Sequence, residues 1–271
     1  MYKVIKNISL LLAAVIICHT SSGQGMQLGE AIIATTPELK PGKSVEDLRA
    51  FVLKDVSSAS NNKNQAVSFH LFQADRGNLK GKYLLVCNVK KISDRKGSLS
   101  TGSPFSDKML GSRNSKKASD VLANPGSFTE YHLLGANNFR SLPDVSILGI
   151  HYLKVRKDRA GDFEKLVLEK MHPAVGDLLP NMHLLTYKAV SGDQKGTYIT
   201  IFAIRSLEAR DEYWPAGKPE TERLKAAFKP LQNLAGELKD YLEPGSYLEP
   251  SGGAAAIFES KEWTDFIHVQ D

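Results

Sequence analysis

The sequence predicts an α+β protein made of two consecutive copies of one βαββαβ unit. The stretch ADRGNLKGKY at residues 74–83 returns as AVSGDQKGTY at residues 189–198, an offset of 115 residues (189 − 74). The strands and helices expected around these two stretches also follow one another in the same order. With 271 residues, of which 42% are hydrophobic and 24% charged, the chain can bury a core in each copy.

The same offset relates two stretches in which apolar residues recur at helical spacing. It carries Asp47 to Asp162 and Val52 to Val167 without a gap. Such spacing places apolar side chains on one face of a helix. The apolar positions are Leu48, Phe51, Val52 and Val56 in the first stretch, and Phe163, Leu166, Val167 and Met171 in the second.

The first copy is expected at residues 24–142. Alternating apolar residues predict its strands and helical spacing its helices. In order, the elements are strand 28–36, helix 44–56, strand 65–74, strand 81–89, a helix ending near Val121, and strand 127–134.

The second copy is expected at residues 143–271 and fills the same slots. The stretch NPGSF at 124–128 of the first copy returns here as EPGSY at 243–247. This offset of 119 residues (243 − 124) is close to 115, so the copies differ little in length. In order, the elements are strand 145–155, helix 162–171, strand 181–190, strand 196–205, helix 222–242, and an extended segment that follows residues 243–259.

The repeated stretch joins the second and third strands of each copy, which predicts a β-hairpin. Gly77 and Gly81 in the first copy correspond to Gly192 and Gly196 in the second, and glycine readily adopts the positive φ of tight turns. Because the stretch does not open a helix, these glycines do not indicate a phosphate-binding loop.

A βαββαβ unit has both helices on one face of its sheet, so the other face needs a cover. The third strands, YLLVCNV and YITIFAI, are apolar on both alternating faces. This is typical of a sheet that meets helices on one side and a second layer on the other. We therefore expect the two copies to pack sheet to sheet.

In this order of elements the chain resembles the dimeric α/β barrel superfamily, whose ferredoxin-like units pair around a central cavity. The resemblance spans about Met26 to Val269, and RSLEARDEYWP at 205–215 is similar to a segment of NIPSNAP-like and antibiotic-biosynthesis-monooxygenase-like members. It implies two tandem ferredoxin-like repeats forming an intramolecular barrel with a small-molecule pocket. A further homo-oligomer is compatible with it.

The N-terminus predicts export. MYKVIKN is followed by the apolar run ISLLLAAVIIC and by small polar residues, the order of a signal peptide at residues 1–23. We expect cleavage after Gly23, a periplasmic or extracellular location, and no transmembrane span thereafter. The alternative is a lipoprotein acylated at Cys18, but Ile17 is bulky where a small residue normally precedes that cysteine.

Charge and cysteines narrow the class of partner. Loss of Lys3 and Lys6 with the leader lowers the net charge from +5 to +3 (5 − 2), and the basic residues are scattered, so we expect no nucleic-acid partner. The basic loop 90–117 is rich in Ser and Gly, which favours a solvated loop. Cys87 is then the only cysteine, and it reads as a small buried hydrophobic residue.

Three histidines are candidates for acid or base catalysis. His70 and His183 lie on equivalent second strands and share a strand face, which Phe72 and Tyr187 continue. If this face lines the cavity, two imidazoles look into one space. If it packs under helices, they are hydrogen-bonded core residues. The same two alternatives hold for His151 on the first strand of the second copy.

Other side chains are candidates for ligand binding. His172 precedes Pro173 at a helix end, where it either complements the helix dipole or, as the resemblance to EthD-like members implies, lies near the pocket. Trp214 either lines the pocket or packs at a helix entry. Tyr83 and Tyr198, at equivalent positions of the third strands, complete the candidate set.

Three functions fit these observations. The first is binding or transformation of a small, mostly apolar molecule without a metal or cofactor, because no HxxxH, HxH, CxxC or GxSxG motif occurs. The second is haem binding of the chlorite-dismutase-like type, with one histidine as iron ligand. The third is a non-catalytic envelope protein that binds a partner through loop 90–117.

Overall fold

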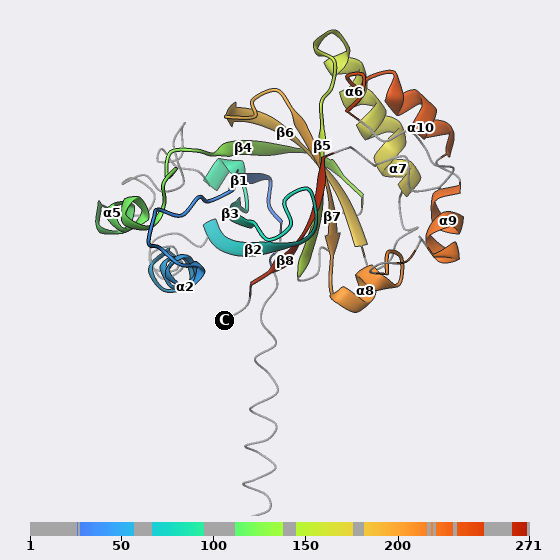
Figure 1. Cartoon of the computed structure of the whole chain (residues 1–271). Coiled ribbons are helices and arrows are strands. Elements are labelled where there is room, and N and C mark those ends of the chain that lie inside the picture. The colour runs from blue at the N-terminus through green and yellow to red at the C-terminus, as the bar shows by residue number, and fades with distance from the viewer. Residues whose placement is uncertain are drawn as a thin grey trace, which may run out of the picture.

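The computed structural model describes ten parts of the chain, which together form the body drawn in Figure 1. The predicted signal peptide, Cys18, most of the basic loop and the boundary at residues 142 and 143 lie outside these parts. The described residues are 26, 28–56, 67–94, 112–137, 145–175, 182–215, 218, 221–229, 232–246 and 262–269.

Eight strands form one closed antiparallel barrel in the order β1-β3-β2-β8-β5-β7-β6-β4. All eight correspond to strands expected from the sequence. Their bounds are β1 Ala31–Thr35, β2 Val67–Gly77, β3 Tyr83–Val89, β4 Thr129–Ala136, β5 Ile147–Leu153, β6 Met182–Gly192, β7 Tyr198–Ile204 and β8 Trp263–His268.

The two halves of the barrel have the same strand order. The first half reads β4-β1-β3-β2 and the second β8-β5-β7-β6, so the fourth strand of each unit lies beside the first. This order is consistent with a ferredoxin-like fold. The halves do not only face one another, as sheet-to-sheet packing predicted, because β2 hydrogen-bonds to β8 and β4 to β6. We call these two junctions the β2–β8 seam and the β4–β6 seam.

Helices cover the outside of the barrel on two opposite sides (Figure 1). On the first half lie α2 (Val45–Ala50), a π-helical segment η1 (Phe51–Val56), a short 3-10 turn (Ile92–Asp94) and α5 (Ser112–Val121). Helix α2 begins with a capping box between Ser44 and Asp47, which satisfies two backbone N–H groups at the helix start. All four apolar positions predicted for the first helix are buried.

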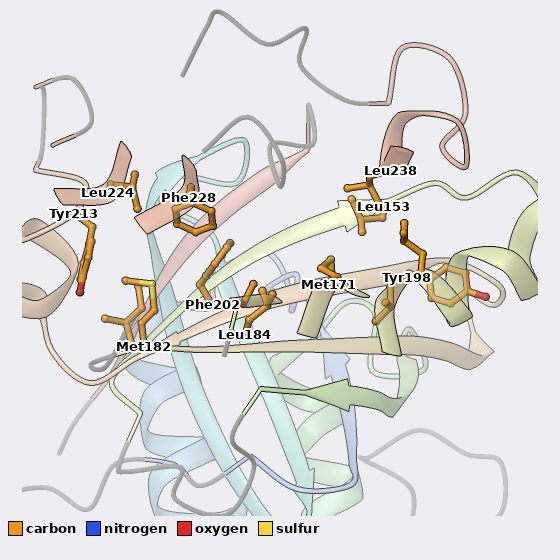
Figure 2. Packing of buried hydrophobic residues seen from close by; sticks show 14 of the residues in the cluster. Leu153, Met171, Met182, Leu184, Tyr198, Phe202, Tyr213, Leu224, Phe228 and Leu238 are labelled. Atoms are coloured by element: carbon orange, nitrogen blue, oxygen red, sulfur yellow. The ribbon is translucent and has the colours of Figure 1, made fainter. Parts of the chain in front are cut away.

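The second half carries more helices, which bury the cluster drawn in Figure 2. Its apolar positions in the predicted helix 162–171 are all buried. The predicted helix 222–242 is described as two helices, with Pro230 between them in the sequence. The elements are a 3-10 turn (Lys157–Arg159), α6 (Ala160–Leu166), π-helical η5 (Val167–Met171), α7 (His172–Val175), α8 (Leu207–Asp211), α9 (Glu222–Phe228) and α10 (Gln232–Lys239).

Strand alternation divides the core into an inner and two outer parts. Side chains such as Phe72, Tyr187 and Phe266 fill the barrel interior. Those at the intervening positions, such as Cys87 and Phe202, pack under the helices of the first and second half respectively. Cys87 is fully buried, as predicted.

The predicted hairpins both lie at one end of the barrel, which we call the hairpin end. All four of their glycines have positive φ: 96° at Gly77, 80° at Gly81, 84° at Gly192 and 90° at Gly196. Among the described residues, no helix is both long and apolar enough to cross a bilayer.

Candidate functional site

A cavity of about 460 Å³ opens at the hairpin end of the barrel. Strand ends from both halves reach it, because antiparallel pairing brings the last residues of β1 and β5 and the first residues of β3, β4 and β8 to this end. Its volume falls within the range of roughly 300 to 1,000 Å³ typical of small-molecule sites.

Apolar and aromatic side chains form the inner part of the cavity. Ala34, Leu79, Leu84, Tyr131 and Tyr152 line it and pack against the interior cluster of the barrel. The cavity is therefore continuous with the inner face of the sheet. It does not lie under the helices.

Two phenols, Tyr131 and Tyr152, contribute polar groups to this inner part, beside buried threonines such as Thr129 and Thr264. Burial raises the pKa of Tyr152 to about 12, and the charge of Glu262 adds to this shift. Burial also raises the pKa of Tyr131, and the neighbouring phenol of Tyr152 adds to that shift. Both hydroxyls consequently stay protonated at neutral pH and can donate hydrogen bonds to a ligand oxygen or nitrogen.

Charged and polar side chains form the rim. Lys154 Nζ donates to Glu262 Oε1 at 2.6 Å, which raises the pKa of Lys154, and Ser127 Oγ donates to Asp193 Oδ2 at 2.5 Å. Both pairs are exposed. The cavity thus has an apolar inner part, one buried and one partly buried phenol, and an exposed, charged mouth.

Four of the residues singled out from the sequence face the barrel interior. Phe72 and Tyr187 belong to the interior cluster, and His70 and His183 are related to them by strand alternation. The strand face that they share is thus the inner face. None of the four lines the cavity. His70 and His183 lie toward the opposite end of their strands.

His70 takes part in a hydrogen-bonded chain at this opposite end. Its Nε2 is 2.8 Å from Ser68 Oγ and its Nδ1 is 3.2 Å from Nε2 of His268. Burial and the neighbouring His268 lower the pKa of His70 to about 4. Burial also lowers the pKa of His183, which contacts the backbone of Asn137. These imidazoles are neutral at pH 7.

The other two histidines singled out from the sequence lie outside the barrel, His151 on the outer face of β5 and His172 on helix α7. His151 packs edge-on against Phe202 and stacks on Trp263, and burial lowers its pKa to about 4. His172 contacts Thr186 Oγ1 at 3.1 Å through Nε2, and burial lowers its pKa to about 4 as well.

The remaining candidates also point away from the cavity. The Tyr198 hydroxyl donates to Glu164 Oε1 at 2.6 Å, and Tyr83 packs partly buried against the helices of the first half. Trp214 lies edge-on to Phe202. No residue of the candidate set lines the described cavity, and their roles in catalysis or binding stay predictions.

Sequence reasoning missed the residues that do line the cavity. Tyr131 and Tyr152 follow the same apolar alternation as their neighbours in TEYHLL and GIHYL, so nothing distinguished them from core residues. Trp263 lies on β8, whose bounds were not predicted. A signal was available in Tyr152, which alternates with His151 and so had to lie on the opposite face of its strand.

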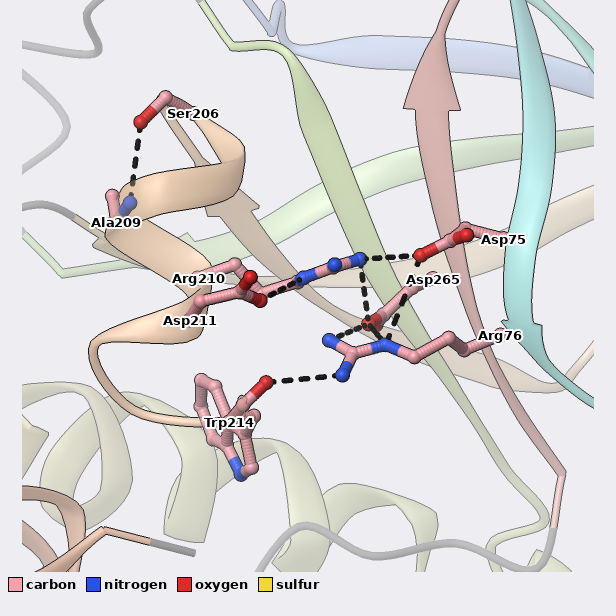
Figure 3. A network of polar contacts seen from close by, with 8 residues as sticks. All are labelled: Asp75, Arg76, Ser206, Ala209, Arg210, Asp211, Trp214 and Asp265. Carbon is pink, nitrogen blue, oxygen red and sulfur yellow. Dashed lines mark hydrogen bonds and ion pairs between the residues drawn. The ribbon is translucent and has the colours of Figure 1, made fainter. Parts of the chain in front are cut away.

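A cluster of charges fastens the β2–β8 seam on the outside of the barrel (Figure 3). Arg76 Nη2 lies 2.7 Å from Asp265 Oδ2, and Arg210 Nη1 lies 2.7 Å from Asp75 Oδ2. The Arg210 side chain is only 5% exposed. Burial raises the pKa of Asp265, and the two guanidinium groups oppose this shift. The cluster joins α8 and β8 of the second half to β2 of the first.

No group of three or more His, Cys, Asp or Glu side chains arranged to hold a metal ion occurs in the parts of the chain that the structure describes. In the charged cluster of the β2–β8 seam, the carboxylates of Asp75 and Asp265 pair with the guanidinium groups of Arg210 and Arg76.

Comparisons with known proteins bear on the fold. No family model and no curated protein matches the sequence. A proposed monooxygenase from Fusobacterium nucleatum subsp. nucleatum has a similar structure, with a TM-score of 0.53 and 8% identity over 90% of this chain and 94% of that one. At this identity the likeness shows the fold alone.

Two further structures are less similar. A proposed monooxygenase from Lactobacillus acidophilus NCFM has a TM-score of 0.49 and 10% identity over 88% of this chain and 92% of that one. A proposed chlorite dismutase has a TM-score of 0.49 and 9% identity over 88% and 94%. The assignment to NIPSNAP-like, antibiotic-biosynthesis-monooxygenase-like or EthD-like members stays a prediction.

Proposed function

We propose that this protein binds a small, mostly apolar molecule, without a metal, in the cavity at the hairpin end. The observation that carries the proposal is the cavity itself, about 460 Å³ in volume, with the phenols of Tyr131 and Tyr152 in an apolar inner part. The ligand expected has an aromatic or aliphatic body and one or two hydrogen-bond acceptors that meet Tyr131 and Tyr152.

Binding, more than catalysis, is what the cavity supports. Among the described residues that line it none is a histidine. Its two phenols stay protonated near pH 7 because burial raises their pKa, so they are not available as bases. Its carboxylates, Glu38, Asp193 and Glu262, belong to exposed rim residues. Catalysis by His70, His151 or His183 therefore concerns other parts of the molecule and stays a separate proposal.

The test uses N-phenyl-1-naphthylamine, an uncharged apolar probe that fluoresces on burial. Ala34→Phe places a phenyl ring in the cavity and is expected to weaken probe binding at least about tenfold. Tyr152→Phe removes one donor and is expected to weaken a ligand with an acceptor by about five- to tenfold. Tyr83→Phe, on the outer face, serves as the matched control and leaves binding unchanged.

The probe can also decide between the two ends of the barrel. Wild-type affinity in Ala34→Phe, together with lost affinity in His183→Ala, would move the site to the histidines that the sequence singled out. Mass spectrometry of small molecules released from the purified protein identifies the natural ligand and its acceptor groups.

Haem is a second candidate because the buried histidines are held in the neutral form that ligates iron. The cavity does not fit haem. Haem iron is held by His, Cys, Met or Tyr side chains, and the described residues that line the cavity include only tyrosines among these. The raised pKa of Tyr131 and Tyr152 disfavours the phenolate form that would bind iron. Adding haem to the purified protein tests this: a Soret shift that one His→Ala variant abolishes supports the candidate, and no shift removes it.

A non-catalytic partner-binding role for the basic loop is a third proposal. Helix α5 carries the buried residues Ala118 and Val121, so a deletion that spares it, residues 95–111, is the appropriate variant. Unchanged capture of a partner by this variant would count against the role.

We also propose that the halves are tandem copies of one ferredoxin-like unit and that the chain is exported. Equal strand orders and π-helical segments at corresponding positions, Phe51–Val56 and Val167–Met171, support the duplication. For export, N-terminal sequencing of protein recovered outside the cytoplasm is expected to start at Gln24, and a retained Met1 would contradict it. The same sample, weighed by light scattering, tests for a further homo-oligomer.

A further inference from the structure

A serine and two histidines form a continuous hydrogen-bonded chain inside the barrel, at the end opposite the hairpins. Ser68 and His70 lie two residues apart on the inner face of β2, and His268 lies on β8 across the seam. Ser68 Oγ is 2.8 Å from His70 Nε2, and His70 Nδ1 is 3.2 Å from His268 Nε2. All three residues are partly exposed to solvent.

The chain can run in either of two directions, and one of them activates the serine. In that direction the Ser68 hydroxyl donates to His70 Nε2, so His70 carries its proton on Nδ1 and donates it to Nε2 of His268. A hydroxyl whose proton faces a neutral imidazole, itself oriented by a third group, is the arrangement of an activated nucleophile. His268 stands where a carboxylate is more usual.

An amide donor is held beside the serine. Asn88 Oδ1 accepts a hydrogen bond from Gly29 N at 2.7 Å, which turns its Nδ2 toward Ser68 Oγ, 3.5 Å away. A donor fixed next to a nucleophilic oxygen can stabilise an oxyanion that forms there. Gly29 is needed for this contact, because a Cβ at its position would lie 2.0 Å from Val89 O.

We propose that Ser68, His70 and His268 form a nucleophilic site that takes an acyl group from a small uncharged ester. Ser68 Oγ bonds to the ester carbonyl carbon, its proton passes to His70 Nε2, and the carbon–oxygen bond to the alcohol breaks as that alcohol receives the proton. Water then hydrolyses the acyl-serine by the same route. Asn88 Nδ2 donates to the carbonyl oxygen while it is negatively charged, and His268 acts as a positioning residue.

This site is separate from the cavity proposed for ligand binding. β2 and β8 both run between the two ends, with Asn78 and Trp263 at the cavity and Ser68 and His268 at the other end. The two proposals therefore fail or succeed independently.

The test follows acetylation by p-nitrophenyl acetate, with release of p-nitrophenol and the mass of each peptide as readouts. We expect one acetyl group on Ser68. Ser68→Ala abolishes it, and His70→Gln slows it about 100-fold. Ser191→Ala is the matched control, because Ser191 is a partly buried strand serine that contacts Glu130.

Positioning by His268 is tested with two variants. His268→Gln keeps a side-chain acceptor for the proton on His70 Nδ1 and is expected to react faster than His268→Leu, which has none. Equal rates in two variants of equal melting temperature would overturn the role of His268.

Two results would overturn the proposal as a whole: no acetylation of Ser68 in the folded wild-type protein, or acetylation of Ser68 at an undiminished rate in His70→Gln. Should Ser68→Ala fail to fold, Ser68→Cys replaces it. A thiol beside His70 is expected to react with iodoacetamide well before the buried Cys87, and the reverse order contradicts the site.

Discussion

The β2–β8 and β4–β6 seams are the same joint built twice with different side chains. In each, the second strand of one half pairs with the fourth strand of the other, with a register shift along the way. In each, a positive-φ hairpin glycine lies against the neighbouring strand: a Cβ on Gly77 would be 2.2 Å from Trp263 O, and one on Gly192 would be 2.0 Å from Phe128 O.

The two seams differ in what fastens them. The β2–β8 seam has the buried charges of Arg210 and Asp265 near the hairpin end and the His70–His268 contact at the other. The β4–β6 seam has the buried carboxylate of Glu130, and at its far end Asn137 Oδ1 accepts from Leu184 N at 2.6 Å. A shared backbone joint therefore tolerates divergent chemistry, provided that its glycines and register are kept.

The largest effect is expected where the joint leaves no room. Gly192→Ala combines a positive φ with a backbone clash, and we expect it to lower the free energy of unfolding by about 4 kcal/mol or more. Gly196→Ala, also at positive φ but with open space around it, is expected to cost about 1 kcal/mol. Urea unfolding measures both.

Gly77→Ala and Gly81→Ala repeat this comparison at the other seam, with the same ranking. If Gly192→Ala and Gly196→Ala were equally stable, the close approach of the hairpin to Phe128 would not constrain the joint. If only one of the two seams showed the difference, the seams would not be equivalent.

The next effect distinguishes the seams. Arg210→Leu leaves Asp75 and the largely buried Asp265 with less positive charge, and we expect a loss of about 3 kcal/mol in the free energy of unfolding. Arg223→Leu, which breaks an exposed pair with Glu212, is the control and is expected to cost less than about 1 kcal/mol. Similar losses for both variants would show that burial adds nothing to the cluster.

Acid is expected to weaken the fold through its buried histidines. The pKa of His70 is lowered to about 4, so between about pH 6.5, the pKa expected for an unfolded histidine, and about pH 4 the unfolded chain binds more protons than the folded one. Stability is therefore fully present above about pH 6.5 and decreases as the pH falls to about 4. His70→Gln is expected to flatten this dependence in urea unfolding measured across the range.

His172→Phe separates the β2–β8 seam from the rest of the barrel. The pKa of His172 is also lowered to about 4, but this residue belongs to α7 and contacts Thr186 of β6. Both variants should flatten the pH dependence, whereas only His70→Gln should slow the hydrogen exchange of β8 amides at pH 5. Equal exchange in both would mean that acid does not act at the seam.

The smallest effect is expected at the rim of the cavity. Lys154 and Glu262 are both about half exposed, and Lys154→Ala is expected to change the free energy of unfolding by about 0.5 kcal/mol. This change should disappear in 1 M salt, because exposed charges are screened. A larger loss that persists in salt would make the rim part of the structural joint between β5 and β8.

Much of the fold could be predicted from the sequence, because strands and helices leave different periods of apolar residues. The short, continuous apolar runs YLLVCNV and YITIFAI predicted both third strands and their two covered faces. The joining of the sheets at their edges was not predicted, since backbone hydrogen bonds between distant strands depend on no particular side chain. Pro230 was the local signal that helix 222–242 would be two helices.

The candidate site was less predictable for a geometric reason. Alternation assigns a residue to one of two faces, and on this basis His70 and His183 were correctly related to Phe72 and Tyr187. Alternation alone does not say which end of a barrel remains open. That depends on how side chains from all eight strands fill the interior, which brought Tyr131 and Tyr152 to the cavity and left the histidines at the other end.

The position of β8 has a consequence for biosynthesis. Among the described residues this strand comes last in the sequence, yet it lies between β2 and β5 and closes the barrel. Until Trp263–His268 has left the ribosome, β2 and β5 each present an unpaired backbone edge, which is a site for association with other chains. A nascent protein of this design therefore cannot complete its sheet before this strand is released, and a variant that lacks the strand would stay permanently open.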